Sequence, residues 1–174
     1  MTGNEITLAQ MLSRREIRAA TQKSFLEKHH SSLVSFTMNI PGPVKTNTLI
    51  RQAFDIGEIL ILEGVARLGA KILDASEIHE STGDELLLAV AKAEPETLKE
   101  LAVHIEGASP LGRLFDIDIL SSEGRKLSRE GFRSCIVCGK QAQECARSRT
   151  HSVSELQEAV MEILTQNLSH KEGD

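Results

Sequence analysis

The sequence contains no tryptophan and no tyrosine, and aromatic side chains make up only 3% of its 174 residues. The core must therefore be aliphatic, and the aromatic platforms on which single-stranded nucleic acids stack are scarce. The formal net charge of −5 also argues against a general binder of nucleic acids or of anionic membranes. We therefore expect neither nucleic acid nor a membrane as a partner.

The sequence also lacks a disulfide framework, a secretory signal and a long apolar run. Its three cysteines are an odd number and lie together late in the chain. The N-terminus has no basic segment followed by an apolar one, and the most apolar stretch, 59–62, is far too short to span a bilayer. We therefore expect a cytoplasmic protein whose thiols are free or bound to a metal.

Apolar periodicity and turn residues predict the order strand, helix, strand, strand, helix, strand between residues 33 and 120. This order is the split βαβ (ferredoxin-like) pattern, an α+β fold in which helices cover one face of an antiparallel sheet. The expected strands cover 33–40, 71–79, 85–91 and 113–120, and the expected helices cover 48–68 and 95–106. A short partner strand is expected at 125–128.

The length fits one domain, 1–174. Within it we expect four parts, which are an N-terminal helix in 1–32, an α+β core in 33–128, a basic cysteine-containing segment in 129–151 and a C-terminal helix in 152–168. Thr7 is the expected cap of the first helix, and Ser152 with Glu155 forms the capping box of the last. The tail, 169–174, is expected to fray.

The sharpest local feature is Asp116-Ile117-Asp118 inside an apolar strand. Residues i and i+2 of a strand share a face and lie about 6.5 Å apart along the backbone. Two carboxylates on one face could hold Mg²⁺, which prefers a few carboxylates together with waters and phosphate oxygens. Nucleotidyl transfer uses such an ion to align the attacking hydroxyl and the leaving pyrophosphate. The alternative is a solvated strand face that carries two acids.

Two further segments offer phosphate contacts. Gly112 and Arg113 precede the acidic strand, where glycine permits close backbone approach to a ligand and arginine presents a fixed fork of donors. Lys45 follows a loop held rigid by two prolines, so it could be pre-positioned against a phosphate. The alternatives are a turn glycine with a surface arginine, and an ordinary strand-ending loop.

The segment 125–151 is basic within an acidic protein. It carries seven Arg or Lys residues against two Glu, a net charge of about +5, so the rest of the chain carries about −10. Arg147, Arg149 and His151 lead directly into the capped C-terminal helix, whose free amides attract anions. This indicates a polyphosphate site, with a solvated basic run as the alternative.

Cys135, Cys138, Cys145 and His151 have ligand types and spacing compatible with a compact Cys3His zinc site. Four protein ligands would leave no open position, so a zinc ion here would be structural. The alternative, of equal weight, is three reduced thiols in a loop with His151 facing a phosphate.

Several long motifs in a fixed order resemble the citrate lyase holo-acyl-carrier-protein synthase family, the phosphoribosyl-dephospho-CoA transferases that act on apo-citrate lyase. The resemblance spans nearly the whole chain, and its motifs are SFTMNIPGPVK, HESTGDE, SPLGRLFDIDIL, GRKLSR and CIVCGKQAQECARSRTHS.

The resemblance implies a nucleotidyltransferase. Such an enzyme moves the prosthetic group from triphosphoribosyl-dephospho-CoA to a serine of the citrate lyase acyl carrier subunit and releases pyrophosphate. Carried onto matching positions, Arg113, Asp116 and Asp118 form the core of the site, with Mg²⁺ on the two aspartates. Likewise Arg147, Arg149 and His151 become phosphate or pocket residues. In the mechanism that we expect, Lys45 or the pair Arg147 and Arg149 helps Arg113 to neutralise the charge that develops on pyrophosphate.

Two alternatives remain from the sequence. One is a related nucleotidyltransferase that serves another carrier protein, such as that of malonate decarboxylase. The other is a non-enzymatic, zinc-stabilised binding module that uses its basic segment, although this leaves the paired aspartates unexplained.

Overall fold

Four antiparallel strands form a single sheet in the computed structural model, which describes residues 1–168. The strands are β1 (Ser32–Met38), β2 (Lys71–Glu80), β3 (Gly83–Ala91) and β4 (Phe115–Leu120). Their order across the sheet is β2-β3-β1-β4, so β1 pairs with both β3 and β4 in antiparallel register. Strands and helices thus combine in an antiparallel α+β fold, which confirms the predicted class.

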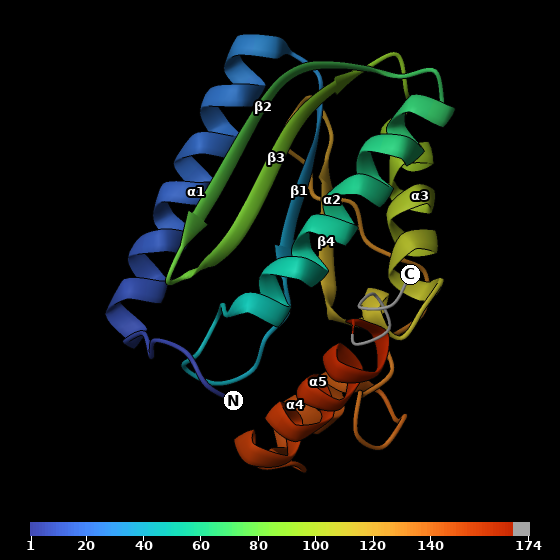
Figure 1. Ribbon diagram of the computed structural model, residues 1–174. Coiled ribbons are helices and arrows are strands. Elements are labelled where there is room, and N and C mark those ends of the chain that lie inside the picture. Colours follow the sequence, from blue (N-terminus) through green and yellow to red (C-terminus); the bar gives the residue numbers. More distant parts are fainter. Residues whose placement is uncertain (169–174) are drawn as a thin grey trace, which may run out of the picture.

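Helices cover both faces of this sheet and one of its ends (Figure 1). The helices are α1 (Leu8–His29), α2 (Thr48–Arg67), α3 (Pro95–Gly107), the 3-10 turn η1 (Leu111–Leu114), α4 (Ala142–Ser148) and α5 (Val153–Leu168). Figure 1 shows α1 on one side of the sheet, α2 and α3 on the other, and α4 with α5 beyond one end. The two crossover helices therefore share a face, as predicted, and the N-terminal helix covers the opposite one.

The main core lies between the sheet and the pair α2 and α3. It is largely aliphatic, as the composition predicts, but three of the five phenylalanines lie at its centre. The rings of Phe36 and Phe54 stack with centroids 4.8 Å apart, and Phe115 meets Phe36 edge to face at 5.4 Å. Gly57 of α2 permits this packing, because a Cβ there would overlap the Phe36 ring.

Both predicted helix caps are confirmed. The Thr7 hydroxyl accepts the amide of Gln10, and the Gln10 side chain accepts the amide of Thr7 in return. Ser152 and Glu155 make the same reciprocal pair at the start of α5. Each cap satisfies amides that a helix leaves unpaired, which is why a short sequence pattern located both starts correctly.

The structure corrects one strand boundary, one predicted strand and one segment without a predicted helix. The strand expected at 113–120 begins at Phe115, because residues 111–114 form the tight turn η1 against the end of α3. The short strand expected at 125–128 is reduced to one bridge between Leu120 and Lys126. The basic cysteine-containing segment 129–151, for which no helix was predicted, contains the seven-residue helix α4. The expectation for 169–174 lies outside the described residues.

No helix in residues 1–168 combines the length and the apolar character that crossing a bilayer requires.

Candidate active site

Asp116 and Asp118 lie on the same face of β4. Burial alternates along the strand, and Phe115, Ile117 and Ile119 point into the core on the other face. The side-chain alternation predicted from the sequence is therefore confirmed.

The acidic face of β4 is the face that α1 covers. Leu120, the next residue on this face after Asp118, belongs to the same apolar cluster as Phe25 and Leu26 of α1. In the pairing with β1, Asp116 lies opposite Thr37 and Asp118 lies opposite Ser35. Polar side chains thus continue from β4 onto β1, so the surface beside the two carboxylates is hydrophilic.

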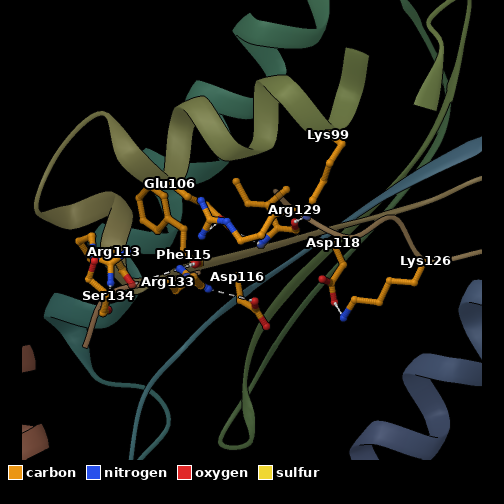
Figure 2. A network of polar contacts seen from close by, with 11 residues as sticks. Lys99, Glu106, Arg113, Phe115, Asp116, Asp118, Lys126, Arg129, Arg133 and Ser134 are labelled. Atoms are coloured by element: carbon orange, nitrogen blue, oxygen red, sulfur yellow. Dashed lines mark hydrogen bonds and ion pairs between the residues drawn. The ribbon is translucent and has the colours of Figure 1, made fainter. Parts of the chain in front are cut away.

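Each carboxylate has its own cationic partner (Figure 2). The Lys126 ammonium lies 2.6 Å from Asp118, and the Arg133 guanidinium lies 3.3 Å from Asp116. The Asp116 side chain is 47% exposed, whereas that of Asp118 is 28% exposed. Asp116 is therefore the more accessible of the two to a ligand.

Arg133 is anchored at the junction of η1 and β4. Its Nη2 donates to the backbone carbonyls of Phe115 at 2.5 Å and Arg113 at 3.3 Å, while its Nη1 reaches Asp116. The side chain is only 21% exposed. These contacts fix a charged group beside Asp116, so Arg133 belongs to the site although the sequence analysis did not single it out.

Glu106, in the last turn of α3, clamps the middle of the acidic strand. Its buried carboxylate accepts the backbone amide of Ile117 at 2.8 Å. Arg129 lies on the same carboxylate at 3.5 Å (Figure 2). Because Ile117 stands between the two aspartates, this contact helps to hold both of them in place.

Three guanidinium groups crowd together at this end of the sheet. Burial lowers the pKa of Arg113, and the nearby charges of Arg133 and Arg129 lower it further. Arg113 also donates to the carbonyl of Ser134. Closely spaced cations repel one another and gain from an anionic ligand, so the arrangement favours phosphate binding.

A cleft of about 710 Å³ opens beside these arginines. Ligand pockets commonly have volumes of about 300–1,000 Å³, so this cleft can accept a nucleotide-sized molecule. Arg113, Arg133 and Arg149 line it together with His151 and the start of α5. The cleft is thus cationic on several sides.

A second, polar cavity of about 140 Å³ lies on the acidic side of β4. Lys45, Arg15 and Asp116 line it, and Asn39 lines both this cavity and the large cleft. Burial, followed by the charge of Arg15, lowers the pKa of Lys45, whose ammonium donates to the carbonyl of Ile40 at 2.6 Å. The two cavities therefore share a wall at Asn39 and at the Arg133–Asp116 pair.

The structure divides the predicted site residues between these cavities. Arg113, Arg149 and His151 line the large cleft, and Lys45 and Asp116 line the smaller cavity. Asp118 and Arg147 line neither of the two. Asp118 nevertheless stays on the same strand face as Asp116, whereas Arg147 is exposed on α4.

Gly112 permits a close approach of the backbone to another part of the protein, not to a ligand cavity as the sequence predicted. Gly112 is buried, and a Cβ there would overlap the carbonyl of Ile105 and lie 3.0 Å from the carbonyl of Glu106. Its amide donates to the Ser109 hydroxyl. Gly112 thus lets η1 pack against the end of α3 and so places Arg113.

We expect Gly112→Ala to lower the free energy of unfolding by about 2 kcal/mol, because the added methyl group forces η1 away from α3. Denaturant titration measures this change. Gly107→Ala is the matched control, since a Cβ at Gly107 meets no atom within 4 Å. Equal stability of the two variants would show that η1 does not depend on this contact.

Two site residues escaped the sequence analysis. Arg133 was counted only as part of a basic segment, and Glu106 only as the end of a helix. One signal was available for Glu106. The periodicity of α3 places this glutamate on the buried face of the helix, and a buried carboxylate needs a partner. That partner, Arg129, comes from a separate segment, so the pairing required the tertiary structure.

The three cysteines and His151 form a cluster at the edge of the large cleft. One ligand atom from each of Cys135, Cys138, Cys145 and His151 lies within 4.8 Å of all the others. In the absence of a cation, burial and then the neighbouring thiols raise the pKa of Cys145 to about 11. The predicted ligands therefore converge, and the cluster could bind a metal such as zinc.

Comparison with known proteins gives a consistent result. The family model described as "Apo-citrate lyase phosphoribosyl-dephospho-CoA transferase" matches residues 6–167. A protein of that name from Citrobacter koseri is 36% identical, over 89% of this chain and 86% of its own. A Vibrio cholerae protein named as a probable member is 36% identical over 91% of both chains. A third, from Escherichia coli O139:H28, is 36% identical over 87% of this chain and 84% of its own.

Proposed function

Because the chain belongs to the apo-citrate lyase phosphoribosyl-dephospho-CoA transferase family, we propose that it attaches the phosphoribosyl-dephospho-CoA prosthetic group to apo-citrate lyase. The observation that carries this proposal is the large cleft lined by Arg113, Arg133 and Arg149, with Asp116 at its border. It offers a nucleotide-sized space, cations for a polyphosphate and an acid beside them.

The reaction is a nucleotidyl transfer. The donor is triphosphoribosyl-dephospho-CoA, and the acceptor is a serine of the citrate lyase acyl carrier subunit. The serine oxygen forms a bond to the α-phosphorus, the bond from that phosphorus to pyrophosphate breaks, and the hydroxyl proton is released. The product is a phosphodiester that links the carrier to the prosthetic group.

The chain's own cations bind and orient the triphosphate. Arg113 and Arg133 are held by backbone contacts, so their charges are in place before the substrate arrives. Pre-positioned charges of this kind stabilise the charge that develops on a leaving group, by about 3 kcal/mol for one donor. Arg149 lines the same cleft from the other wall, and Lys45 lines the smaller cavity together with Asp116.

Asp116 and Asp118 fit a magnesium ion. Both are carboxylates on one strand face, and oxygen ligands are those that Mg²⁺ prefers. When bound, the ion would screen phosphate charge and favour departure of pyrophosphate. The triphosphate competes with Asp116 for Arg133, so substrate binding frees the Asp116 carboxylate for this role.

The proposal extends to the plan of the scaffold. We infer that residues 33–128 form one split βαβ (ferredoxin-like) unit, supported by the strand order β2-β3-β1-β4 and by the two crossover helices on one face. In this arrangement β4 is an edge strand, and within residues 1–168 β1 is the one strand that pairs with it. Its end therefore remains open to the segment that carries Arg133.

Transfer to purified carrier subunit tests the function directly. The chain is incubated with apo-carrier, the triphosphate donor and Mg²⁺, and the carrier is weighed by mass spectrometry. We expect the carrier to gain the mass of the prosthetic group while pyrophosphate accumulates. A carrier with its acceptor serine replaced by alanine should gain nothing.

Two outcomes would contradict this assignment. Modification of the malonate decarboxylase carrier, with none of the citrate lyase carrier, would favour the related nucleotidyltransferase. Absence of transfer to either carrier, combined with salt-sensitive binding of RNA or DNA, would favour a non-enzymatic module.

A further inference from the structure

We propose that Cys135, Cys138, Cys145 and His151 bind one structural Zn²⁺ ion, and that this ion fixes the wall of the large cleft that carries Arg149. The first observation is convergence. The four ligand atoms lie within 4.8 Å of one another, and the sulfurs of Cys138 and Cys145 are 3.5 Å apart. Tetrahedral sulfur ligands about 2.3 Å from zinc lie about 3.8 Å from each other, so small adjustments complete the site.

The second observation is a buried imidazole nitrogen without a partner. Nε2 of His151 is excluded from solvent and makes no hydrogen bond within the described residues. A buried polar atom left unpaired costs about 1–3 kcal/mol. Coordination of a metal by this nitrogen removes that cost, whereas a phosphate contact would require the nitrogen to be accessible.

The backbone around the first two cysteines is already folded as a ligand turn. Gly139, with φ of 73°, donates its amide to the carbonyl of Cys135 at 3.0 Å, and the Cys135 amide donates to Lys140 at 2.6 Å. These backbone hydrogen bonds close a tight turn over 135–140, which brings the sulfurs of Cys135 and Cys138 within 4.8 Å of each other.

The segment 129–152 has no apolar core of its own that could hold this geometry. Its buried residues are Cys135 and Cys145, and large apolar side chains such as Phe132 and Val137 are exposed. A segment this small that buries so little surface commonly needs a metal or a disulfide to define its fold. The cysteines are therefore the natural centre of the segment.

The expected role is structural because four protein ligands leave no position for substrate or water. Three of the ligands line the large cleft, and Arg149 lies between two of them in the sequence with a left-handed backbone (φ 49°). Zinc would thus connect the segment that contacts Arg113 with the start of α5. This consequence for the cleft rests on the proposed function, but the metal site itself does not.

Metal analysis of the full chain tests the proposal. After expression with added zinc and purification under reducing conditions, we expect about one zinc per chain. His151→Ala should lower the bound zinc by about 10-fold or more. His104→Ala, an exposed histidine on α3, is the matched control and should retain the metal.

A second measurement keeps the test decisive if His151→Ala misfolds. Wild-type chain stripped with a chelator is titrated with Co²⁺, and three thiolates with one imidazole should give intense thiolate-to-cobalt charge transfer and the visible bands of tetrahedral cobalt. Folded wild-type chain without zinc and without this spectrum would overturn the proposal, as would a Cys138–Cys145 disulfide in the reduced preparation. Neither readout depends on transferase activity, so failure of the proposed function leaves the metal result intact.

Discussion

Asp116→Asn should lower kcat/KM for carrier modification by about 100-fold or more, the size of effect seen when one pre-positioned electrostatic contact is lost. Asp116 is the more exposed aspartate of the pair and lines the cavity that meets the large cleft. The amide keeps the shape of the side chain but supplies neither the negative charge proposed to bind Mg²⁺ nor the charge that opposes Arg133. Initial rates of mass gain on the carrier subunit measure the effect.

The stability of the Asp116→Asn variant should remain close to that of the wild type. The side chain is half exposed, and Arg133 keeps its contacts with the carbonyls of Phe115 and Arg113. Asp55→Asn, the same change at an exposed position on α2, is the matched control. Full activity of the Asp116 variant at limiting Mg²⁺ would show that the carboxylates of β4 take no part in the reaction.

Glu106→Ala should lower the free energy of unfolding by about 3 kcal/mol, because loss of one partner leaves a largely buried charge unpaired. The buried carboxylate of Glu106 serves both Arg129, whose side chain is 22% exposed, and the amide of Ile117. Alanine removes both contacts and also leaves that amide without its acceptor. Guanidinium titration followed by circular dichroism measures the change.

Glu106→Gln separates the two contributions. Glutamine can still accept the Ile117 amide but no longer neutralises Arg129, so we expect an intermediate loss of stability. Glu100→Ala, an exposed position on the same helix, is the control for truncation of a glutamate. If Glu106→Ala and Glu100→Ala unfold at the same denaturant concentration, the clamp on β4 contributes nothing.

Glu106 and Asp116 both act on the strand β4, but from different sides. Glu106 reaches β4 from the core side at Ile117, whereas Asp116 leaves the same strand on the opposite face (Figure 2). The buried carboxylate of Glu106 therefore holds the backbone of β4, while the carboxylate of Asp116 stays on the accessible face of the same strand. Substitution of Glu106 should therefore reduce activity because β4 and Asp116 shift, although Glu106 itself does not touch the substrate.

Much of the fold was predictable because its signals are local. Alternation along 115–120 determined which side chains share a face, since the period of a strand depends only on its backbone. The capping pairs Thr7 with Gln10 and Ser152 with Glu155 span three residues each, so they located two helix starts. The helix α4 was not predicted because it has no side-chain hydrogen bond at its N-cap and its seven residues are too few to show an apolar period.

The candidate site was predictable only in its parts. The sequence supplied two aspartates, a set of arginines and a cysteine cluster, but it placed Arg129 and Arg133 only within a basic segment that indicates an anion site. In the folded chain both side chains turn inward, and they are neutralised by Asp116 and Glu106 respectively. Only packing of that segment against η1 and α3 determines such pairings.

The sequence by itself determined the α+β class, the shared face of Asp116 and Asp118, and the ligand types of the cysteine cluster. Each of these follows from residue type and from spacing along a few residues of backbone. The tertiary structure alone decided that Arg133, 17 residues from Asp116, is its partner, and that Arg113 and Arg149 line one cleft. The physical reason is that ion pairs and clefts depend on distance through space, which is set by how helices and sheet pack rather than by the order of residues.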